Sequence, residues 1–124
     1  MLPSIRVKDV KAAVQFYTEK LGFTLNRTQE VSDNNSLTFG DASIMLEGDG
    51  AFYSESYNAA IRQRLGSASA STYYIEADDL NALYAKVSAG GVKIVDPLAD
   101  RAWGQAEFTL EDPEGNWVTF WHAL

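Results

Sequence analysis

The chain has 124 residues, enough for one domain, and its 46% hydrophobic content is typical of a globular protein rather than a disordered one. Ten basic residues against seventeen acidic ones give a net charge of −7, which disfavours binding to nucleic acid. Without cysteine there are no disulfides or thiolate metal ligands, and no apolar run approaches the roughly 20 residues of a membrane span. These features predict a cytoplasmic protein without nucleic-acid or membrane partners.

The first part of the chain predicts a strand, a helix and three further strands. Asp9 is a suitable N-cap for a helix that ends at Gly22. A short extended run at 23–25 and two alternating strands within 37–46 follow the helix. The apolar residues of the helix recur at the spacing of one buried face, which comprises Val10, Ala13, Val14, Tyr17 and Leu21.

A segment rich in glycine, serine and alanine follows at 48–70, with a short helix expected over 57–65. We interpret this segment as a connector and lid. The second part of the chain then repeats the first, because Ile75 opens a helical pattern 70 positions after Ile5 does. Either Asp78 or Asp79 caps this second helix, which Gly90-Gly91 ends, and its face comprises Leu80, Leu83, Tyr84 and Val87.

An extended run at 92–94 and two strands within 108–120 complete the second pattern. Both parts therefore predict the order βαβββ. The expected organisation is one α+β domain over 1–124, with a first module at 1–47, the connector at 48–70 and a second module at 71–124. Each module alone would be marginal in size, so the two are expected to share a core or to pair with a second chain.

Strand alternation predicts which side chains point away from the helices. In the last strand Val118 and Phe120 would meet the helices, so the tryptophans on either side of Thr119 point away. The same alternation assigns to the far face Leu2, Ser4, Arg6, Met45, Glu47, Thr72, Tyr74 and Glu76. Burying one tryptophan is worth roughly 4–6 kcal/mol at about 25 cal/mol per Å². We therefore expect a ligand or a second subunit to cover this face.

The residues of the far face are suited to bind a flat, cationic molecule. The aromatic candidates for stacking on its rings are Trp103, Trp117, Trp121 and Tyr74. The candidates for attracting its positive charge are Glu47, Glu76 and Glu107, and Met45 would line the floor of the site. The alternatives are that the tryptophans fill a dimer core, that Met45 is packing filler, and that the glutamates are solvated charges at strand edges.

No catalytic residue emerges from the pattern. His122 is the single histidine, lies on the opposite face from Thr119, and is interpreted as a surface or edge-strand residue. No Ser-His-Asp arrangement can be built around it. The glycine pairs near Asp49 and at 90–91 lack the spacing and the lysine of a phosphate-binding loop. We therefore predict no catalytic residues and no cofactor.

Two segments resemble the vicinal oxygen chelate superfamily, which includes glyoxalase I, extradiol dioxygenases and bleomycin-resistance proteins. One is PSIRVKDVKAAVQFY at 3–17, followed by LGF at 21–23. The other carries W-G-x-x-x-F and D-P-x-G-N runs at 103–116 and is most similar to the bleomycin-resistance branch. The resemblance covers nearly the whole chain. It implies two βαβββ modules that form a curved mixed sheet around a cavity, usually in a homodimer with modules arranged or swapped across the interface.

Enzymes of this superfamily hold a divalent ion with His, Gln or Glu at four positions. The resemblance places these positions at Leu2, Met45, Thr72 and Thr119, and none of these side chains supplies imidazole or carboxylate. We therefore predict a metal-free homodimer that binds and sequesters an aromatic, cationic small molecule, with bleomycin-type antibiotics as the family precedent. The alternative is a metal-dependent lyase or dioxygenase of the same superfamily. It requires a different alignment of the ligand positions, for example one that brings in Glu47 or Glu76.

Overall fold

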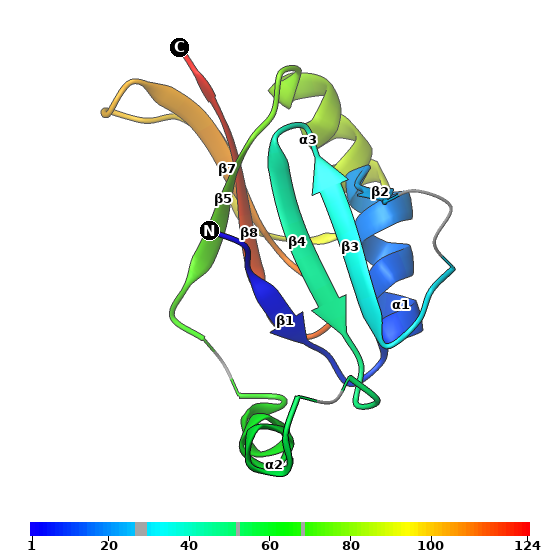
Figure 1. Cartoon of the computed structure of the whole chain (residues 1–124). Helices are drawn as coiled ribbons and strands as arrows, with labels where there is room; N and C mark the ends of the chain where they lie inside the picture. Colours follow the sequence, from blue (N-terminus) through cyan, green and yellow to red (C-terminus); the bar gives the residue numbers. More distant parts are fainter. Residues whose placement is uncertain (27–29, 52, 68) are drawn as a thin grey trace. The chain divides into compact units, whose positions relative to one another are not determined.

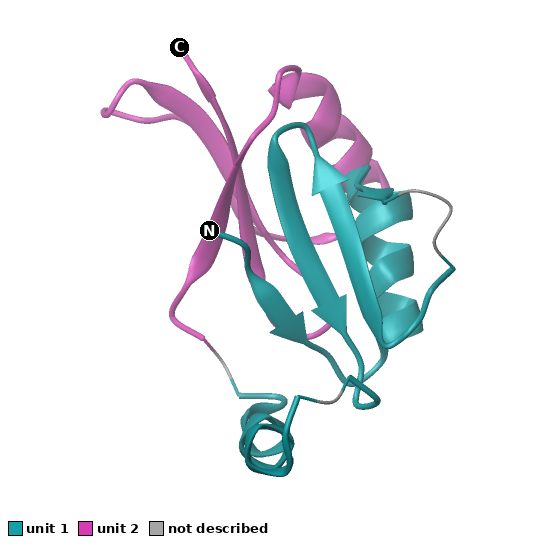
Figure 2. Cartoon of the chain, in the orientation of Figure 1, with its two compact units in different colours: residues 1–68 teal, residues 69–124 magenta. Residues whose placement is uncertain are grey.

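The computed structural model describes residues 1–26, 30–51, 53–67 and 69–124. The chain divides into two compact units, Met1–Ala68 and Ser69–Leu124, which Figure 2 shows in different colours. Each unit carries its own four-stranded mixed sheet, so the predicted α+β class with two βαβββ modules is confirmed. Of the predicted connector, Phe52 and Ala68 lie outside the described residues. Among the described residues, no helix is long and apolar enough to cross a membrane.

Unit 1 follows the predicted order of elements (Figure 1). Its sheet has the strand order β1-β4-β3-β2, in which β1 and β4 are parallel and the other pairs are antiparallel. Its elements are β1 (Ser4–Arg6), α1 (Val10–Gln15), the π-helical turn η1 (Phe16–Leu21), β2 (Thr24–Leu25), β3 (Asn34–Phe39), β4 (Ala42–Glu47) and α2 (Glu55–Arg64).

Unit 2 has the same topology. Its strand order is β5-β8-β7-β6, with β5 and β8 parallel and the remaining pairs antiparallel. Its elements are β5 (Thr72–Glu76), α3 (Leu80–Ala89), β6 (Lys93–Asp100), β7 (Gln105–Glu111) and β8 (Trp117–Ala123). The central strands β8 and β7 therefore occupy the places that β4 and β3 occupy in unit 1.

The helices begin where the sequence predicts. The Asp9 carboxylate accepts a hydrogen bond of 3.0 Å from the backbone N–H of Ala12, and Asp79 rather than Asp78 caps α3 through Ala82. The first helical segment differs from the prediction in its second half, where the chain passes into η1 before Gly22, at φ 90°, ends it. The predicted apolar face of this segment is buried at Ala13, Val14, Tyr17 and Leu21.

The alternation in the sheets is also as predicted. In β8, Val118 and Phe120 are buried, whereas Trp117 is 42% exposed. On the helix side of unit 2, the Tyr84 ring of α3 lies 4.9 Å from the Phe108 ring of β7. This packing leaves the odd-numbered residues of β7 and β8 on the opposite side of the sheet.

Two expectations about unit 2 are corrected. The extended run expected at 92–94 is a strand of eight residues, β6, whose register shifts around Pro97. Proline lacks a backbone N–H, so a strand tolerates it at an edge or an irregularity, and β6 offers both. His122 was expected on a surface or an edge strand, but it is half-buried in β8, a central strand, where it pairs with Ala106.

The D-P-x-G-N run forms the turn between β7 and β8. The buried Asp112 carboxylate accepts hydrogen bonds from the backbone N–H groups of Glu114 and Asn116 and from the Asn116 side chain. Gly115 has φ 87°, a conformation that glycine adopts without steric cost. The motif thus fixes the hairpin turn directly before Trp117, the first residue of β8.

The two aspartates before α3 test the capping assignment. Asp79→Ala should lower the free energy of unfolding by about 1 kcal/mol, because it removes the hydrogen bond to the N–H of Ala82. The adjacent change Asp78→Ala should lower it by less than about 0.5 kcal/mol. Urea denaturation of both variants measures the difference. Equal losses in the two variants would contradict the assignment.

Candidate functional site

The candidate site is the side of the unit 2 sheet opposite α3, which we call the aromatic face. Its rings are well exposed: Tyr74 is 54% exposed, Trp117 42%, and Trp103, in the turn before β7, 65%. The strand register places Trp121 between Glu76 of β5 and Glu107 of β7. The face comprises Thr72, Tyr74, Glu76, Trp103, Gln105, Glu107, Thr109, Glu111, Trp117, Thr119 and Trp121.

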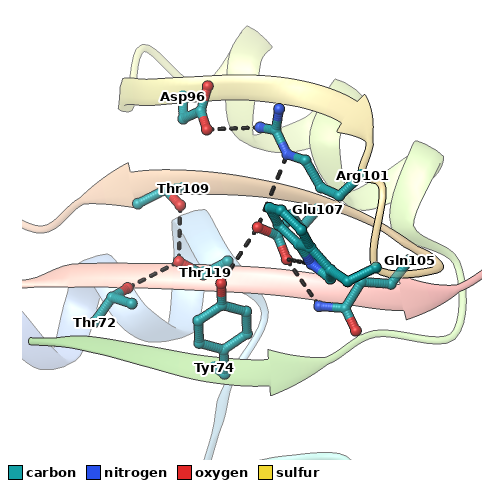
Figure 3. A network of polar contacts seen from close by, with 9 residues as sticks. Thr72, Tyr74, Asp96, Arg101, Gln105, Glu107, Thr109 and Thr119 are labelled. Carbon is teal, nitrogen blue, oxygen red and sulfur yellow. Dashed lines mark hydrogen bonds and ion pairs between the residues drawn. The ribbon is translucent and has the colours of Figure 1, made fainter.

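Glu107 is the hub of this face (Figure 3). It is only 6% exposed, and its Oε1 accepts a hydrogen bond of 3.2 Å from the Tyr74 hydroxyl. Its Oε2 accepts hydrogen bonds from Gln105 Nε2 at 2.8 Å and from the indole N–H of Trp103 at 3.4 Å. A buried carboxylate needs such partners, because its desolvation would otherwise cost several kcal/mol. The carboxylate therefore holds two exposed rings in fixed places.

The positively charged side chain of Arg101 lies next to Glu107. Arg101 Nε lies 3.9 Å from Glu107 Oε1, and Arg101 Nη2 donates to Asp96 Oδ2 at 2.6 Å. The Arg101 side chain is 22% exposed and thus partly shielded from solvent. The guanidinium lies between two carboxylates, so the chain itself supplies the cation that balances Glu107 (Figure 3).

The centre of the aromatic face is a chain of three threonines. Thr119, which is 1% exposed, lies 2.8 Å from the Thr72 hydroxyl and 2.7 Å from the Thr109 hydroxyl. These three residues come from β5, β8 and β7, and Figure 3 shows their hydroxyls in a row. A hydroxyl can donate one hydrogen bond and accept others, so the row satisfies its own polar atoms.

Glu111 holds the third exposed ring. Its Oε1 accepts a hydrogen bond of 3.1 Å from the indole N–H of Trp117, and its Oε2 accepts one of 3.0 Å from Lys93. These two hydrogen bonds lower the pKa of Glu111, and the one from Lys93 has the larger effect. The carboxylate thus stays ionised while Lys93 balances its charge.

The pKa of Tyr74 is raised, first by partial desolvation of the phenol and then by the charge of Glu107 and the hydrogen bond to it. A raised pKa keeps the phenol neutral and able to donate. Tyr74 is therefore a fixed, uncharged ring at neutral pH.

Unit 1 has its own buried carboxylate on the side of the sheet away from the core. Glu47 is 1% exposed and accepts hydrogen bonds from Ser4 at 2.6 Å, from Asn34 at 3.1 Å and from the Tyr53 hydroxyl. The hydrogen bond to Glu47 is the main cause that raises the pKa of Tyr53. Met45, two residues earlier in β4, is half-buried on the same side of the strand.

Arg6 lies on the same side of the unit 1 sheet. Its Nη2 donates to the backbone carbonyl of Ala51 at 3.1 Å, and its guanidinium lies 6.0 Å from the centre of the Tyr57 ring. This arrangement joins β1 to α2 through a cation–π contact. Arg6 is also the residue of β1 that pairs with Glu47.

The predicted site residues thus fall into two groups. Met45 and Glu47 belong to unit 1, and the remaining six belong to unit 2. Hydrogen bonds join Tyr74, Trp103 and Glu107 directly, whereas the strand register alone makes Glu76 and Trp121 neighbours. Sequence reasoning missed the carboxylate of Glu111 itself. It also missed the partners of the carboxylates, which comprise Ser4, Asn34, Tyr53, Lys93, Arg101 and Gln105. Alternation in β7 could have pointed to Gln105 and Glu111, since both share the side of Glu107.

The side chains at the four positions where the resemblance implies metal ligands do not suit a divalent cation. In unit 2, Thr72 and Thr119 are bonded to each other through their hydroxyls. In unit 1, Met45 offers only a thioether and Leu2, at 50% exposure, offers no donor atom. In the part of the chain that the structure describes, no three His, Cys, Asp or Glu side chains come close enough together to hold a metal ion. We therefore derive no chemical step through a metal.

Comparison with known proteins now identifies the family. The model of the Glyoxalase/Bleomycin resistance protein/Dioxygenase superfamily matches residues 3–120. The chain belongs to this superfamily. It is 26% identical over 128 residues to bleomycin resistance proteins of Geobacillus stearothermophilus and Staphylococcus aureus, with 99% of this chain and 96% of each relative covered. The predicted resemblance to the superfamily, nearest the bleomycin-resistance branch, is thus confirmed.

Several solved protein structures share the fold. UcmS2 has a TM-score of 0.70 and 25% identity, with 97% of this chain and 94% of that chain covered. TioX from Micromonospora sp. ML1 has a TM-score of 0.73 and 21% identity, with coverage of 100% and 98%. A protein of the superfamily from Alicyclobacillus acidocaldarius has a TM-score of 0.70 and 21% identity, with coverage of 100% and 90%. These likenesses extend over the whole chain and support the fold.

The contact between Tyr74 and Glu107 can be tested by titration. Glu107→Gln should lower the pKa of Tyr74 toward the ordinary tyrosine value of about 10, because it removes the neighbouring negative charge. Glu76→Gln removes an exposed carboxylate from the same face and should leave this pKa unchanged. Tyrosinate absorbance measures the ionisation of the tyrosines as the pH rises. Subtracting the titration of a Tyr74→Phe variant isolates the contribution of Tyr74.

The same contact should appear in the pH dependence of stability. The unfolded chain ionises Tyr74 near its ordinary pKa of about 10, before the folded chain does, so the folded state loses stability as the pH rises through the folded value. The Glu107→Gln variant should show a smaller loss over this range. An unchanged Tyr74 titration in that variant would show that the carboxylate does not act on the phenol.

Proposed function

We propose that this protein binds and sequesters an aromatic, cationic small molecule of the bleomycin type, without using a metal. The observation that carries the proposal is the aromatic face, where Tyr74, Trp103 and Trp117 remain well exposed although each is fixed by a hydrogen bond to a carboxylate. Exposed rings of this kind are typical of a recognition surface rather than of a core.

The fixed rings favour binding energetically. A cation over an aromatic ring gains about 0.5–2 kcal/mol, and tyrosine and tryptophan have few rotatable bonds to immobilise. Because Glu107 and Glu111 already orient three of the rings, little conformational freedom is lost when a ligand stacks on them. Trp121, paired in register with Glu76 and Glu107, extends the surface across β8.

Capture rather than turnover fits the polar groups of the face. The hydroxyls of Thr72, Thr119 and Thr109 form hydrogen bonds with one another. The Glu107 carboxylate already accepts hydrogen bonds from side chains of the same chain. Neither group is poised to take a proton from a ligand. The similarity to proteins named for bleomycin resistance supports the same proposal, because resistance by stoichiometric binding needs no reacting group. In unit 1, Glu47 and Met45 remain predicted ligand-binding residues, and 48–70 remains a predicted connector and lid.

The proposal includes a homodimer located in the cytoplasm. The large exposed aromatic side chains of unit 2 would be costly to leave in water, so a second subunit or a ligand is expected to cover part of them. The high acidic content, with a net charge of −7, favours an attraction to cationic molecules.

The first experiment is a titration of the metal-analysed protein with a bleomycin-type antibiotic, followed by tryptophan fluorescence. The expected result is quenching that saturates at one ligand per site in protein freed of metal by a chelator, because a stacked ring lies against Trp103, Trp117 or Trp121. No response, together with a stoichiometric bound divalent ion in the untreated protein, would contradict the proposal. That outcome would support a metal-dependent lyase or dioxygenase instead.

A pair of substitutions at Tyr74 tests the stacking surface. Tyr74→Ala should weaken antibiotic binding by about two- to thirtyfold, which corresponds to the loss of one cation–π contact of about 0.5–2 kcal/mol. Tyr74→Phe keeps the ring and should bind nearly as tightly as the wild type, although it loses the hydrogen bond to Glu107. Dissociation constants from the same fluorescence titration measure both effects. Equal affinities of Tyr74→Ala and the wild type would exclude Tyr74 from the site.

A further inference from the structure

We infer that Glu76 is the residue that selects a positively charged ligand, and that Glu107 acts only as a positioning residue for the rings. This inference rests on the proposed function and assigns different roles to carboxylates that the sequence treats alike. It follows from counting which acceptor atoms of the aromatic face the chain already uses.

Glu107 has no capacity left for a ligand cation. A carboxylate offers about four acceptor sites on its two oxygens. On Glu107, Oε1 faces the Tyr74 hydroxyl and Arg101, and Oε2 accepts from Trp103 and Gln105. A ligand cation would have to displace one of these donors at a site that is 6% exposed. Displacement would leave a buried group of the protein unpaired, which is strongly unfavourable.

The other carboxylates with partners are similarly committed. Glu111 already forms an ion pair with Lys93 and accepts a hydrogen bond from the indole N–H of Trp117. Asp96 forms an ion pair with Arg101, in which Arg101 Nη2 lies 2.6 Å from Asp96 Oδ2. In unit 1, Glu47 is 1% exposed and accepts from three side chains. Each of these groups therefore stabilises the fold or orients a ring before any ligand arrives.

Glu76 differs from all of them. It is exposed at the end of β5, and no side chain within the described residues forms a hydrogen bond or an ion pair with it. Its Cα partner across the sheet is Trp121, and Tyr74 lies two residues before it on the same side of the strand. All of its acceptor sites are available next to two aromatic side chains.

The position of Glu76 also defines the shape of the ligand. Residues two apart in a strand are separated by about 7 Å and point to the same side of the sheet. A ring stacked on Tyr74 would therefore place a substituent about 7 Å away within reach of Glu76. The expected ligand class is a planar aromatic compound with a pendant ammonium or guanidinium group, rather than a ring that is charged at its centre.

The test compares three glutamine variants in the fluorescence titration with a bleomycin-type antibiotic at low and high salt. Glu76→Gln should weaken binding about three- to tenfold at low salt and should remove most of the salt dependence, because an exposed charge pair is screened by ions. Glu107→Gln should weaken binding but keep the salt dependence of the wild type. Glu19→Gln, which changes an exposed carboxylate of η1, is the matched control and should bind like the wild type.

The outcomes separate this inference from the proposed function. If the wild type binds and Glu76→Gln retains both its affinity and its salt dependence, Glu76 does not select the charge and the inference fails while the proposed function stands. Loss of salt dependence in Glu107→Gln instead would assign the charge contact to Glu107. If the wild type shows no saturable binding, the proposed function fails and the inference fails with it.

Discussion

The burial of the Glu107 carboxylate is the constraint on which the arrangement of unit 2 depends. A charged group that is 6% exposed is stable only if donors surround it, and the chain supplies them from three places: Tyr74 of β5, Gln105 of β7 and the turn that carries Arg101 and Trp103. Satisfying the carboxylate therefore fixes two aromatic rings on the surface of the sheet. Ring placement, which determines what the face can bind, is a consequence of charge burial.

Unit 1 solves the same problem with a different arrangement. In β3 and β4, Asn34 pairs in register with Glu47, and in β7 and β8, Glu107 pairs with Trp121. The two sheets have the same topology, so these pairs occupy equivalent places. The carboxylate of the pair lies on β4 in unit 1 but on β7 in unit 2, although β8 is the strand that corresponds to β4. Each repeat thus keeps one buried glutamate in this pair of positions, and in unit 2 the place of Glu47 is taken by the aromatic residue Trp121.

The hydroxyl row offers a physical view of how the superfamily fold can be used for binding. Thr72 and Thr119 occupy positions at which the resemblance implies metal ligands, and in this chain they bond to each other and to Thr109. A hydroxyl row satisfies its own hydrogen bonds without an ion, whereas imidazole and carboxylate ligands placed together need one. In the proposed function the surrounding rings recognise the ligand, and such recognition requires no electrophilic centre.

The sequence by itself determined the order of the elements and the faces of the strands, because these follow from local periodicity and from capping and turn residues such as Asp9 and Asp112. It also named the aromatic and acidic residues of the candidate site as a prediction. Only the tertiary structure decided which carboxylates are occupied, since Arg101 and Lys93 reach Glu107 and Glu111 across strands that are joined by register and not by spacing. Charge pairing depends on distances between side chains from different strands, and no periodicity in the sequence records those distances.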